Sequence, residues 1–517
     1  MPALAAATDF HSPHIAYAHL APILILFGAA CVGVMVEAIL PRTARHLAQV
    51  AVALGGLVAA LVAVIAVAGA QETTAAGAVA IDGPALAIEA ILALLGIASV
   101  LMLADRSADV GGAFVAEAAI TPGSPADRRL LASPYSQTEA FPLTIFALAG
   151  MMLFAASNNL LLMFVALEVL SLPLYLLCGL ARRRRLLSQE AAVKYFLLGA
   201  FASAFFLYGV ALLYGYAGTV QLRGIFHAAS SATSNDLLLF LGLALLVVGL
   251  LFKAGIAPFH SWTPDVYQGA PTPVTALMAG CTKVAAFGAI LRVLYVAFAN
   301  TRWDWRPLIW GVAIVSMVVG AVLAVTQTDV KRLLAYSSVA NAGFIMVGVV
   351  ALTKTGISST LFYLVAYGFT TIGAFAVVTL VRGPDGEATH LSQWAGLGKR
   401  SPLLAGVFTF FMLAFAGLPL TSGFTSKFAV FSAAIDGGAT PLVIVAVVAS
   451  AVLAFPYLRV VVLMYFSGPA ETGPSVVLPG GFTSAAVTLG VLATLVLGVA
   501  PQPLLDLASH AARFVGS

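Results

Sequence analysis

Apolar segments about 20 residues long follow one another along most of the chain, and each is long enough to cross a bilayer as a helix. Only 9% of the residues are charged, whereas soluble domains have about 25%, and the mean hydropathy is +1.03. We therefore predict an all-α polytopic membrane protein with about 14 transmembrane helices. They are expected at approximately 15–40, 46–70, 84–104, 141–157, 159–180, 189–217, 237–260, 272–299, 307–326, 331–352, 359–381, 402–434, 440–466 and 483–501.

The basic residues predict the orientation of these helices, because cytoplasmic loops of membrane proteins are enriched in Lys and Arg. The loops expected in the cytoplasm hold Arg42, Arg45, Arg182, Arg183, Arg184, Arg185, Lys331, Arg332, Lys399 and Arg400. The opposite loops hold few, chiefly Arg223, Arg302, Arg306 and Lys354. Both termini are then expected in the periplasm, with the chain in the inner membrane of a bacterial cell. Since the basic residues set orientation, the net charge of +4 does not indicate nucleic-acid binding.

The layout of the spans predicts an internal repeat. We expect three transmembrane helices and a cytoplasmic loop in 1–140, one five-helix set in 141–300, a second in 301–466, and a last helix with an amphipathic tail in 467–517. Because five is an odd number, the two sets are expected to be inverted relative to each other. The fourth helix of each set contains a proline, Pro258 or Pro419, and should be broken there.

The first of these breaks lies beside a lysine. Lys253 is five residues before Pro258 in a hydrophobic run, and proline at 258 removes a backbone hydrogen bond and clashes with the carbonyl of Ala254. Ionisable residues at membrane depth are costly and usually mark an ion or proton path. The alternative is a kinked helix whose lysine reaches the membrane surface.

Further ionisable residues in the spans suggest a path for protons. Lys194, Lys283 and Lys427 lie in apolar segments, and Glu168 is the expected partner of Lys253. A buried lysine can take up and release a proton near neutral pH, and a nearby carboxylate alters that exchange. Alternatives stay open: Lys194 could form an ordinary pair with Glu190, and Lys427 could reach the surface. His260 is either a proton relay or an interfacial histidine.

Other chemistries find little support in the sequence. The chain lacks a Gly-rich phosphate loop, and too few histidines lie in the spans to hold haem. Sodium would favour a cage of oxygen ligands, yet no aspartate lies in a predicted span. Cys31, Cys178 and Cys281 form no CxxC pair, so no thiolate metal site is expected. The roles of Glu37, Glu89 and the loop 105–139 stay open.

Four stretches resemble the antiporter-like membrane subunits of respiratory complex I. They are FKAGIAPFHSWTPDVYQGAPTPV, ALEVLSLPLY, AAVKYFLLGA and TQTDVKRLLAYSSVANAGFIMVG, and the likeness covers roughly residues 140–466. The resemblance implies fourteen helices with two inverted five-helix repeats and a midplane chain of charged residues. It implies that Glu168 and Lys253 are the family's glutamate–lysine pair, Lys283 its central lysine and Lys427 its terminal lysine. Lys194 and His260 also match positions relevant to proton transfer.

We therefore predict a proton-translocating subunit of NADH:quinone oxidoreductase that works with other membrane subunits of the complex. No cofactor is expected in this chain, while flavin mononucleotide, iron–sulfur clusters and the handling of NADH and quinone are expected in partner subunits. The alternative is a subunit of a cation/proton antiporter, which the same fold would serve.

Overall fold

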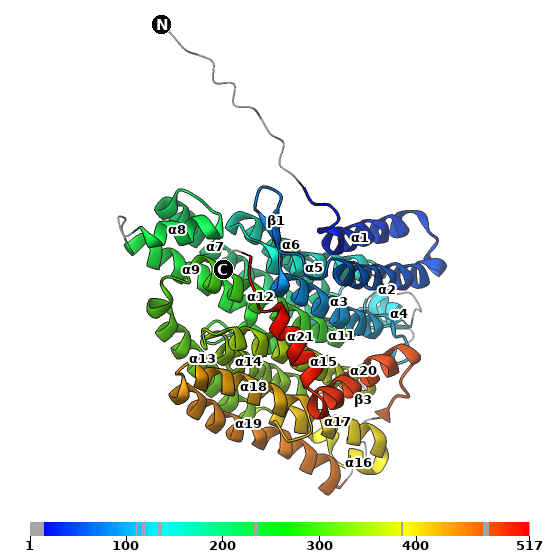
Figure 1. Cartoon of the computed structure of the whole chain (residues 1–517). Coiled ribbons are helices and arrows are strands. Elements are labelled where there is room, and N and C mark those ends of the chain that lie inside the picture. The colour runs from blue at the N-terminus through cyan, green and yellow to red at the C-terminus, as the bar shows by residue number, and fades with distance from the viewer. Residues whose placement is uncertain are drawn as a thin grey trace.

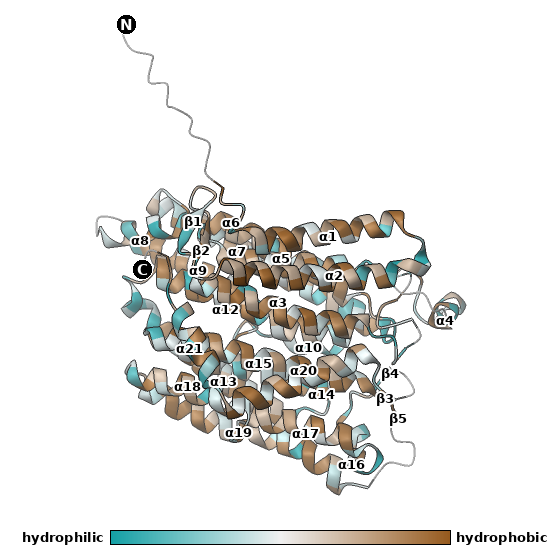
Figure 2. Ribbon diagram, turned by 45° about the vertical axis from the view of Figure 1, so that its right-hand side comes forward, coloured by the Kyte–Doolittle hydropathy of each residue, from teal (hydrophilic) through white to brown (hydrophobic). Residues whose placement is uncertain are grey.

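The protein is a bundle of long helices that run side by side, as a computed structural model shows (Figure 1). The structure describes residues 15–109, 111–115, 117, 119–132, 137–231, 236–383, 386–468 and 475–515. The helices are apolar around most of their circumference (Figure 2), as expected of segments that bury one side in the bundle and expose the other to lipid. Several begin at a polar cap: Asp82, Asn159 and Asp329 each accept a backbone N–H of the first turn.

The chain begins with three long helices, two short strands and a short helix. These are α1 (Ala21–Ile39), α2 (Arg42–Ala66), the antiparallel strands β1 (Glu72–Thr74) and β2 (Val79–Ile81), α3 (Gly83–Ala104), and the short helix α4 (Pro125–Ala132). Helix α4 lies in the segment 105–139, for which the sequence predicted only a loop.

Two sets of helices follow. The first contains α5 (Ala140–Ala156), α6 (Leu160–Cys178), α7 (Arg185–Ala217), α8 (Leu222–Ser230), α9 (Asp236–Ala254), α10 (Trp262–Gly269), and a continuous helix made of α11 (Thr272–Leu277), the π-helical η1 (Met278–Thr282), α12 (Lys283–Arg292) and the π-helical η2 (Val293–Ala297). The second contains α13 (Arg302–Thr326), α14 (Val330–Val349), α15 (Lys354–Leu380), α17 (Pro402–Ala416), α18 (Ser422–Asp436) and α19 (Thr440–Phe466).

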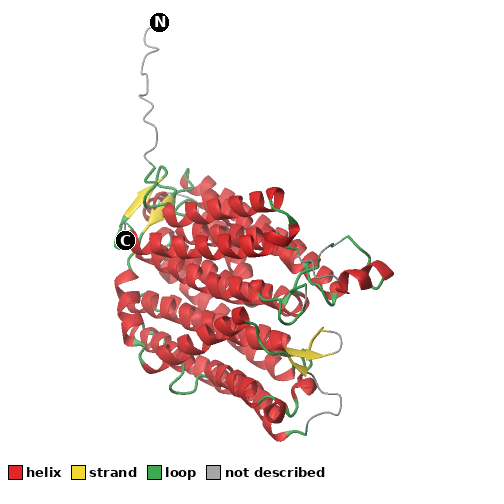
Figure 3. Cartoon of the chain, turned by 90° about the vertical axis from the view of Figure 1, so that its right-hand side faces the viewer, coloured by secondary structure: helices red, strands yellow, loops and turns green. Residues whose placement is uncertain are grey.

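Short elements link α15 to α17, and two helices end the chain. The links are β3 (Val381–Gly383), β4 (Gly386–Glu387), the 3-10 helix η3 (Leu391–Trp394) and α16 (Leu397–Arg400); after α19 come β5 (Ser475–Val476), α20 (Gly481–Val499) and α21 (Gln502–Ala511). Strand β3 pairs with both β4 and β5. Small strands lie at both ends of the bundle (Figure 3).

The number of spans agrees with the sequence prediction. Among the described residues, 12 helices are long and apolar enough to cross a membrane, and two shorter apolar helices, α5 and α17, complete the predicted set. Each five-helix set therefore contains the expected spans, with α17 and α18 forming one broken span. The central helices α14 and α15 are almost wholly buried, whereas α1 and α20 are largely exposed.

Both predicted helix breaks are confirmed. Helix α9 ends at Ala254, and the next residue, Gly255, has a left-handed backbone with φ +66°. Helix α17 ends at Ala416, followed by Gly417 with φ +86°. A residue with a side chain is strained in this conformation, so glycine is the natural residue for such a turn. The two breaks thus share the order alanine, left-handed glycine and then proline.

The C-terminal tail forms the expected short helix, α21, which packs against α15 and α3. Beyond it, the Val515 N–H donates to Asp82 (3.1 Å). Asp82 also forms a two-point ion pair with Arg292, with O–N distances of 2.7 and 2.9 Å, in which both side chains are almost fully buried. The tail is therefore anchored to a buried ion pair that joins α3 to α12.

Candidate functional site

Lys253 lies in the last turn of α9, buried between α6 and α7. Its Nζ donates to Ser171 Oγ (2.8 Å) and to the Tyr195 hydroxyl (3.2 Å). The ring of Tyr195 lies 5.4 Å from the same nitrogen, within range of a cation–π contact. Only 3% of Lys253 is exposed. The alternative interpretation of the sequence, in which this lysine reaches the membrane surface, is therefore wrong.

Glu168 lies on α6, one turn before Ser171, and is half-buried. Its Oε1 is buried without a hydrogen-bond partner among the described residues. The carboxylate is close enough to interact electrostatically with Lys253, but the two residues do not form an ion pair within 4.0 Å. Among the described residues, the lysines that form such pairs are Lys194 and Lys331. Ser171 and Tyr195, and not Glu168, are therefore the direct hydrogen-bond partners of the lysine.

Lys283 follows the π-helical turn η1 and is 2% exposed. Its Nζ donates to the carbonyl of Ala254 (2.7 Å), the last residue of α9. A side chain at Gly255 would bring a Cβ within 3.7 Å of this nitrogen. The terminal carbonyls of a helix carry partial negative charge and lack partners within the helix. The first helix break thus supplies the acceptor for the central lysine.

Lys427 repeats this arrangement at the second break. Its Nζ donates to the carbonyls of Phe415 (3.0 Å) and Ala416 (3.3 Å) at the end of α17, and to Ser450 Oγ (2.9 Å). The lysine is 6% exposed, so it too remains inside the bundle. Both Lys283 and Lys427 are therefore held by the carbonyl end of a broken helix.

His260 and Lys194 lie apart from these contacts. His260 follows the first break and faces the ring of Tyr336, with centroids 6.3 Å apart; its Nδ1 is buried without a hydrogen-bond partner in the described part of the chain. Lys194 is about two-fifths exposed and pairs with both Glu190 (2.6 Å) and Asp265 (2.7 Å). The pair with Glu190 considered from the sequence is thus present, together with a second partner on α10.

A chain of polar side chains next to Lys427 escaped the sequence reasoning. The Tyr363 hydroxyl donates to Asn341 (2.8 Å), Asn341 donates to the Ser337 carbonyl (2.8 Å), and Ser337 is hydrogen-bonded to Tyr457. Asn341, Tyr363 and Lys427 also line a cavity of ≈ 10 Å³, enough for about one water molecule. The polar residues of the sequence YSSVAN in α14 could have indicated this chain of hydrogen bonds.

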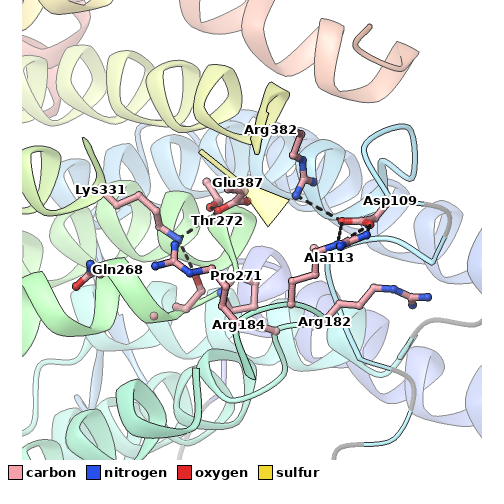
Figure 4. A pocket seen from close by; sticks show the side chains of 14 residues that line it. Asp109, Ala113, Arg182, Arg184, Gln268, Pro271, Thr272, Lys331, Arg382 and Glu387 are labelled. Atoms are coloured by element: carbon pink, nitrogen blue, oxygen red, sulfur yellow. Dashed lines mark hydrogen bonds and ion pairs between the residues drawn. The ribbon is translucent and has the colours of Figure 1, made fainter. Parts of the chain in front are cut away.

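A charged pocket lies where the loop before α7, strands β3 and β4 and the start of α14 meet (Figure 4). Arg183 and Arg382 bind Asp109 (2.8 and 3.4 Å), and Lys331 lies 3.6 Å from Glu387. The sequence assigned Lys331 only to a basic loop, but the residue is 2% exposed, and its Nζ also donates to the carbonyl of Ala270 (2.8 Å). Lys331 is thus a further buried lysine, and it has a carboxylate partner.

The described residues contain no group of three or more His, Cys, Asp or Glu side chains placed to hold a metal ion. Cys178 and Cys281 are buried, and Cys31 is exposed. Glu89, whose role the sequence left open, is also buried, with 1% of the residue exposed.

Comparison with known proteins gives concordant matches. Residues 157–454 match the model of the NADH:quinone oxidoreductase/Mrp antiporter transmembrane family. The chain is 62% identical to the NADH-quinone oxidoreductase subunit N of Salinispora arenicola, over 98% of this chain and 100% of that protein.

Among solved structures, a chain of respiratory complex I from Thermus thermophilus with bound aureothin has a TM-score of 0.75 and 35% identity, covering 94% of this chain and 99% of that one. A chain of the Mrp complex from Dietzia shares the fold, with a TM-score of 0.80 at 24% identity and coverage of 96% and 97%. The chain therefore belongs to the NADH:quinone oxidoreductase/Mrp antiporter transmembrane family, and within it to the subunit N branch.

Proposed function

We propose that the chain is a proton-translocating membrane subunit of NADH:quinone oxidoreductase. The observation that carries this proposal is the state of Lys253, Lys283 and Lys427: each is nearly fully buried, and each is held by hydroxyl or carbonyl oxygens rather than by a carboxylate. An ammonium in such a place is costly unless its surroundings compensate it. Small changes around these lysines therefore shift the balance between ammonium and neutral amine.

The first step of the mechanism involves Glu168 and Lys253. When Lys253 carries a proton, the Ser171 and Tyr195 oxygens and the nearby Glu168 carboxylate stabilise its charge. When Glu168 is protonated or moves away, that stabilisation weakens and Lys253 releases its proton more readily. Glu168 thus tunes Lys253 without a direct contact, because Ser171 fixes the position of the ammonium.

The later steps involve the two lysines at the helix breaks. An ammonium at Lys283 or Lys427 donates to the carbonyl end of a helix, where positive charge is favoured. The neutral amine loses most of this attraction. Binding and release of a proton therefore change the strength of the hydrogen bonds between the lysine and the broken helix. Tyr363, Asn341 and Ser337 supply hydrogen-bonding groups beside Lys427. Moving one charge against 100 mV requires about 2.3 kcal/mol, the scale of one such charge-assisted hydrogen bond.

Lys194 and His260 complete the set of proposed proton-transfer residues. Lys194 shares Asp265 with Arg332 (2.7 Å from each), so its charge belongs to a partly exposed network on α7, α10 and α14. His260, with its unpartnered Nδ1 directly after the first break, is placed to relay a proton beside Tyr336. We expect both to contribute less than the three buried lysines.

The energy for translocation comes, in this proposal, from electron transfer in partner subunits that hold the flavin and iron–sulfur clusters and handle NADH and quinone. The chain is a multi-pass membrane protein; its place in the inner membrane, its two periplasmic termini and the division at 140, 300 and 466 are part of the proposal. The segments that carry Arg42, Arg182 to Arg185, Lys331 and Lys399 would then lie on the cytoplasmic side of the membrane.

The rival function is a cation/proton antiporter subunit, with which the chain shares its fold. Purification from native membranes in mild detergent, followed by identification of the co-purifying subunits and an NADH:quinone assay, separates the two. Co-migration with flavin and iron–sulfur subunits that oxidise NADH is the expected result. Migration with antiporter-like chains alone, together with sodium-sensitive proton exchange, would contradict the proposal.

A further inference from the structure

Two arginines on the side of the membrane that carries few basic residues line one cavity. Arg223 of α8 and Arg302 at the start of α13 belong to the few basic residues on the side opposite the Arg182–Arg185 loop. They line a cavity of ≈ 430 Å³ together with Phe226, Tyr295, Asn300 and Trp303. Basic residues on this side are disfavoured by the rule that sets orientation, so their convergence from distant segments calls for a function.

The charge of this cavity is positive and uncompensated. None of the residues that line it is acidic, and neither arginine takes part in the ion pairs that the described residues form within 4.0 Å. Arg302 stacks on the ring of Trp303, 5.4 Å from its centroid, which leaves its N–H groups free for a ligand. Asp304 follows Trp303 in the chain but is not part of the lining. Paired guanidinium groups are suited to bind a phosphate.

Helix α13, whose first two residues line the cavity, also has an exposed apolar face. Leu308, Val315, Val318 and Val322 are 42–54% exposed, and their spacing of seven, three and four residues puts them on one face of the helix. Trp303, 63% exposed at the mouth of the cavity, is the kind of residue that lies at the boundary between membrane and water. A ligand with a charged head and apolar chains matches this arrangement, whereas a free phosphate would use only the cavity.

We propose that this cavity binds the headgroup of an anionic phospholipid, with Arg223 and Arg302 on its phosphate and its acyl chains along the exposed face of α13. The volume lies within the range of ordinary ligand pockets, about 300–1,000 Å³, and accommodates a headgroup. The inference is independent of proton translocation, because none of the residues involved belongs to the buried lysine path.

The test uses the intact membrane assembly, purified in mild detergent and incubated with photoactivatable phosphatidylglycerol. Labelled peptides from α8 and from the start of α13 are quantified by mass spectrometry. We expect labelling in the wild type and at least a tenfold loss in the double variant Arg223→Gln, Arg302→Gln, a change of about 1.4 kcal/mol in binding. The matched control is Lys354→Gln, an exposed cation of the same side that does not line the cavity; its labelling should be unchanged.

Three results would overturn the proposal. They are equal labelling of the double variant and the wild type, retention of radiolabelled inorganic phosphate that lipid does not displace, and cross-linking of the cavity to a neighbouring subunit in place of lipid. The double variant Arg223→Lys, Arg302→Lys keeps both charges and should retain intermediate labelling, which separates loss of the site from loss of the fold. Co-purification of the partner subunits verifies assembly of each variant.

Discussion

Replacement of Gly417 by alanine should displace the ammonium of Lys427 directly. A Cβ at this position would lie 3.2 Å from Lys427 Cδ and 3.3 Å from Nζ. These distances are too short for comfortable contact, and the flexible lysine is the group that has to move. The left-handed backbone, with φ +86°, adds strain of about 1–2 kcal/mol. The substitution therefore combines backbone strain at position 417 with displacement of the Lys427 side chain.

The size of the effect follows from the contacts of Lys427. Its Nζ makes hydrogen bonds of 2.9, 3.0 and 3.3 Å, and a hydrogen bond to a charged group is worth about 1.5–3 kcal/mol. Loss of one such bond lowers the population of the docked lysine at least tenfold. We expect NADH oxidation to persist in inside-out vesicles while acidification of the vesicle interior per NADH oxidised declines.

Gly438→Ala is the matched control. Gly438 also has a left-handed backbone, with φ +75°, but nothing lies within 4 Å of the added Cβ. Both variants should lose the backbone contribution to thermal stability, Gly417→Ala should lose more because it also disturbs Lys427, and only Gly417→Ala should lose acidification. Equal acidification by the two variants would refute the idea that the carbonyl end of α17 holds a working lysine.

Three further predictions concern the anchors of the structure. Arg292→Met leaves Asp82 buried without its partner, so the complex should lose about 3–5 kcal/mol of stability; an unchanged thermal midpoint and yield would contradict this. Burial raises the pKa of Asp127, but hydrogen bonds from the Gly123 N–H and the Arg185 guanidinium lower it by more, so the pKa in the folded protein is below its usual value. The stability that ionised Asp127 contributes is therefore present above about pH 4 and is lost as the pH falls through its pKa in the folded protein. Hydrogen exchange in α4 should therefore rise in the wild type only at acid pH, but already at pH 7 in Asp127→Asn. Asp265→Asn should lower acidification more than Lys194→Gln, because Asp265 forms ion pairs with both Lys194 and Arg332. A single exposed ion pair contributes only about 0–1 kcal/mol. A larger loss of acidification in Lys194→Gln than in Asp265→Asn would contradict the shared network.

The sequence predicted the spans, the two broken helices and the buried lysines, because these depend on local properties. Length and apolarity alone identify a membrane helix. Pro258 and Pro419 each follow a glycine by two or three residues, and the helix ends just before that glycine, whereas Pro173 and Pro456 lie inside unbroken helices. The burial of Lys253, Lys283 and Lys427 follows from their distance to the ends of their spans, and the structure places all three inside the bundle.

The contacts of these residues could not be predicted, because they join distant parts of the chain. Ser171 and Tyr195 hold Lys253 across separations of 82 and 58 residues, and Arg292 finds Asp82 across 210. Lys331 was assigned to a cytoplasmic loop because it lies at the boundary between the predicted spans 307–326 and 331–352. Only packing against Ala270 and Glu387 buries it.

The most direct test of the account is acidification by inside-out vesicles that carry Lys253→Met, with NADH as the substrate. Methionine keeps most of the volume of the side chain but cannot hold a proton, and Lys354→Met provides an exposed lysine as control. The account predicts that Lys253→Met assembles with its partner subunits and acidifies the vesicles markedly less than the control. Normal acidification by an assembled Lys253→Met complex would contradict the claim that protons pass through the buried lysines.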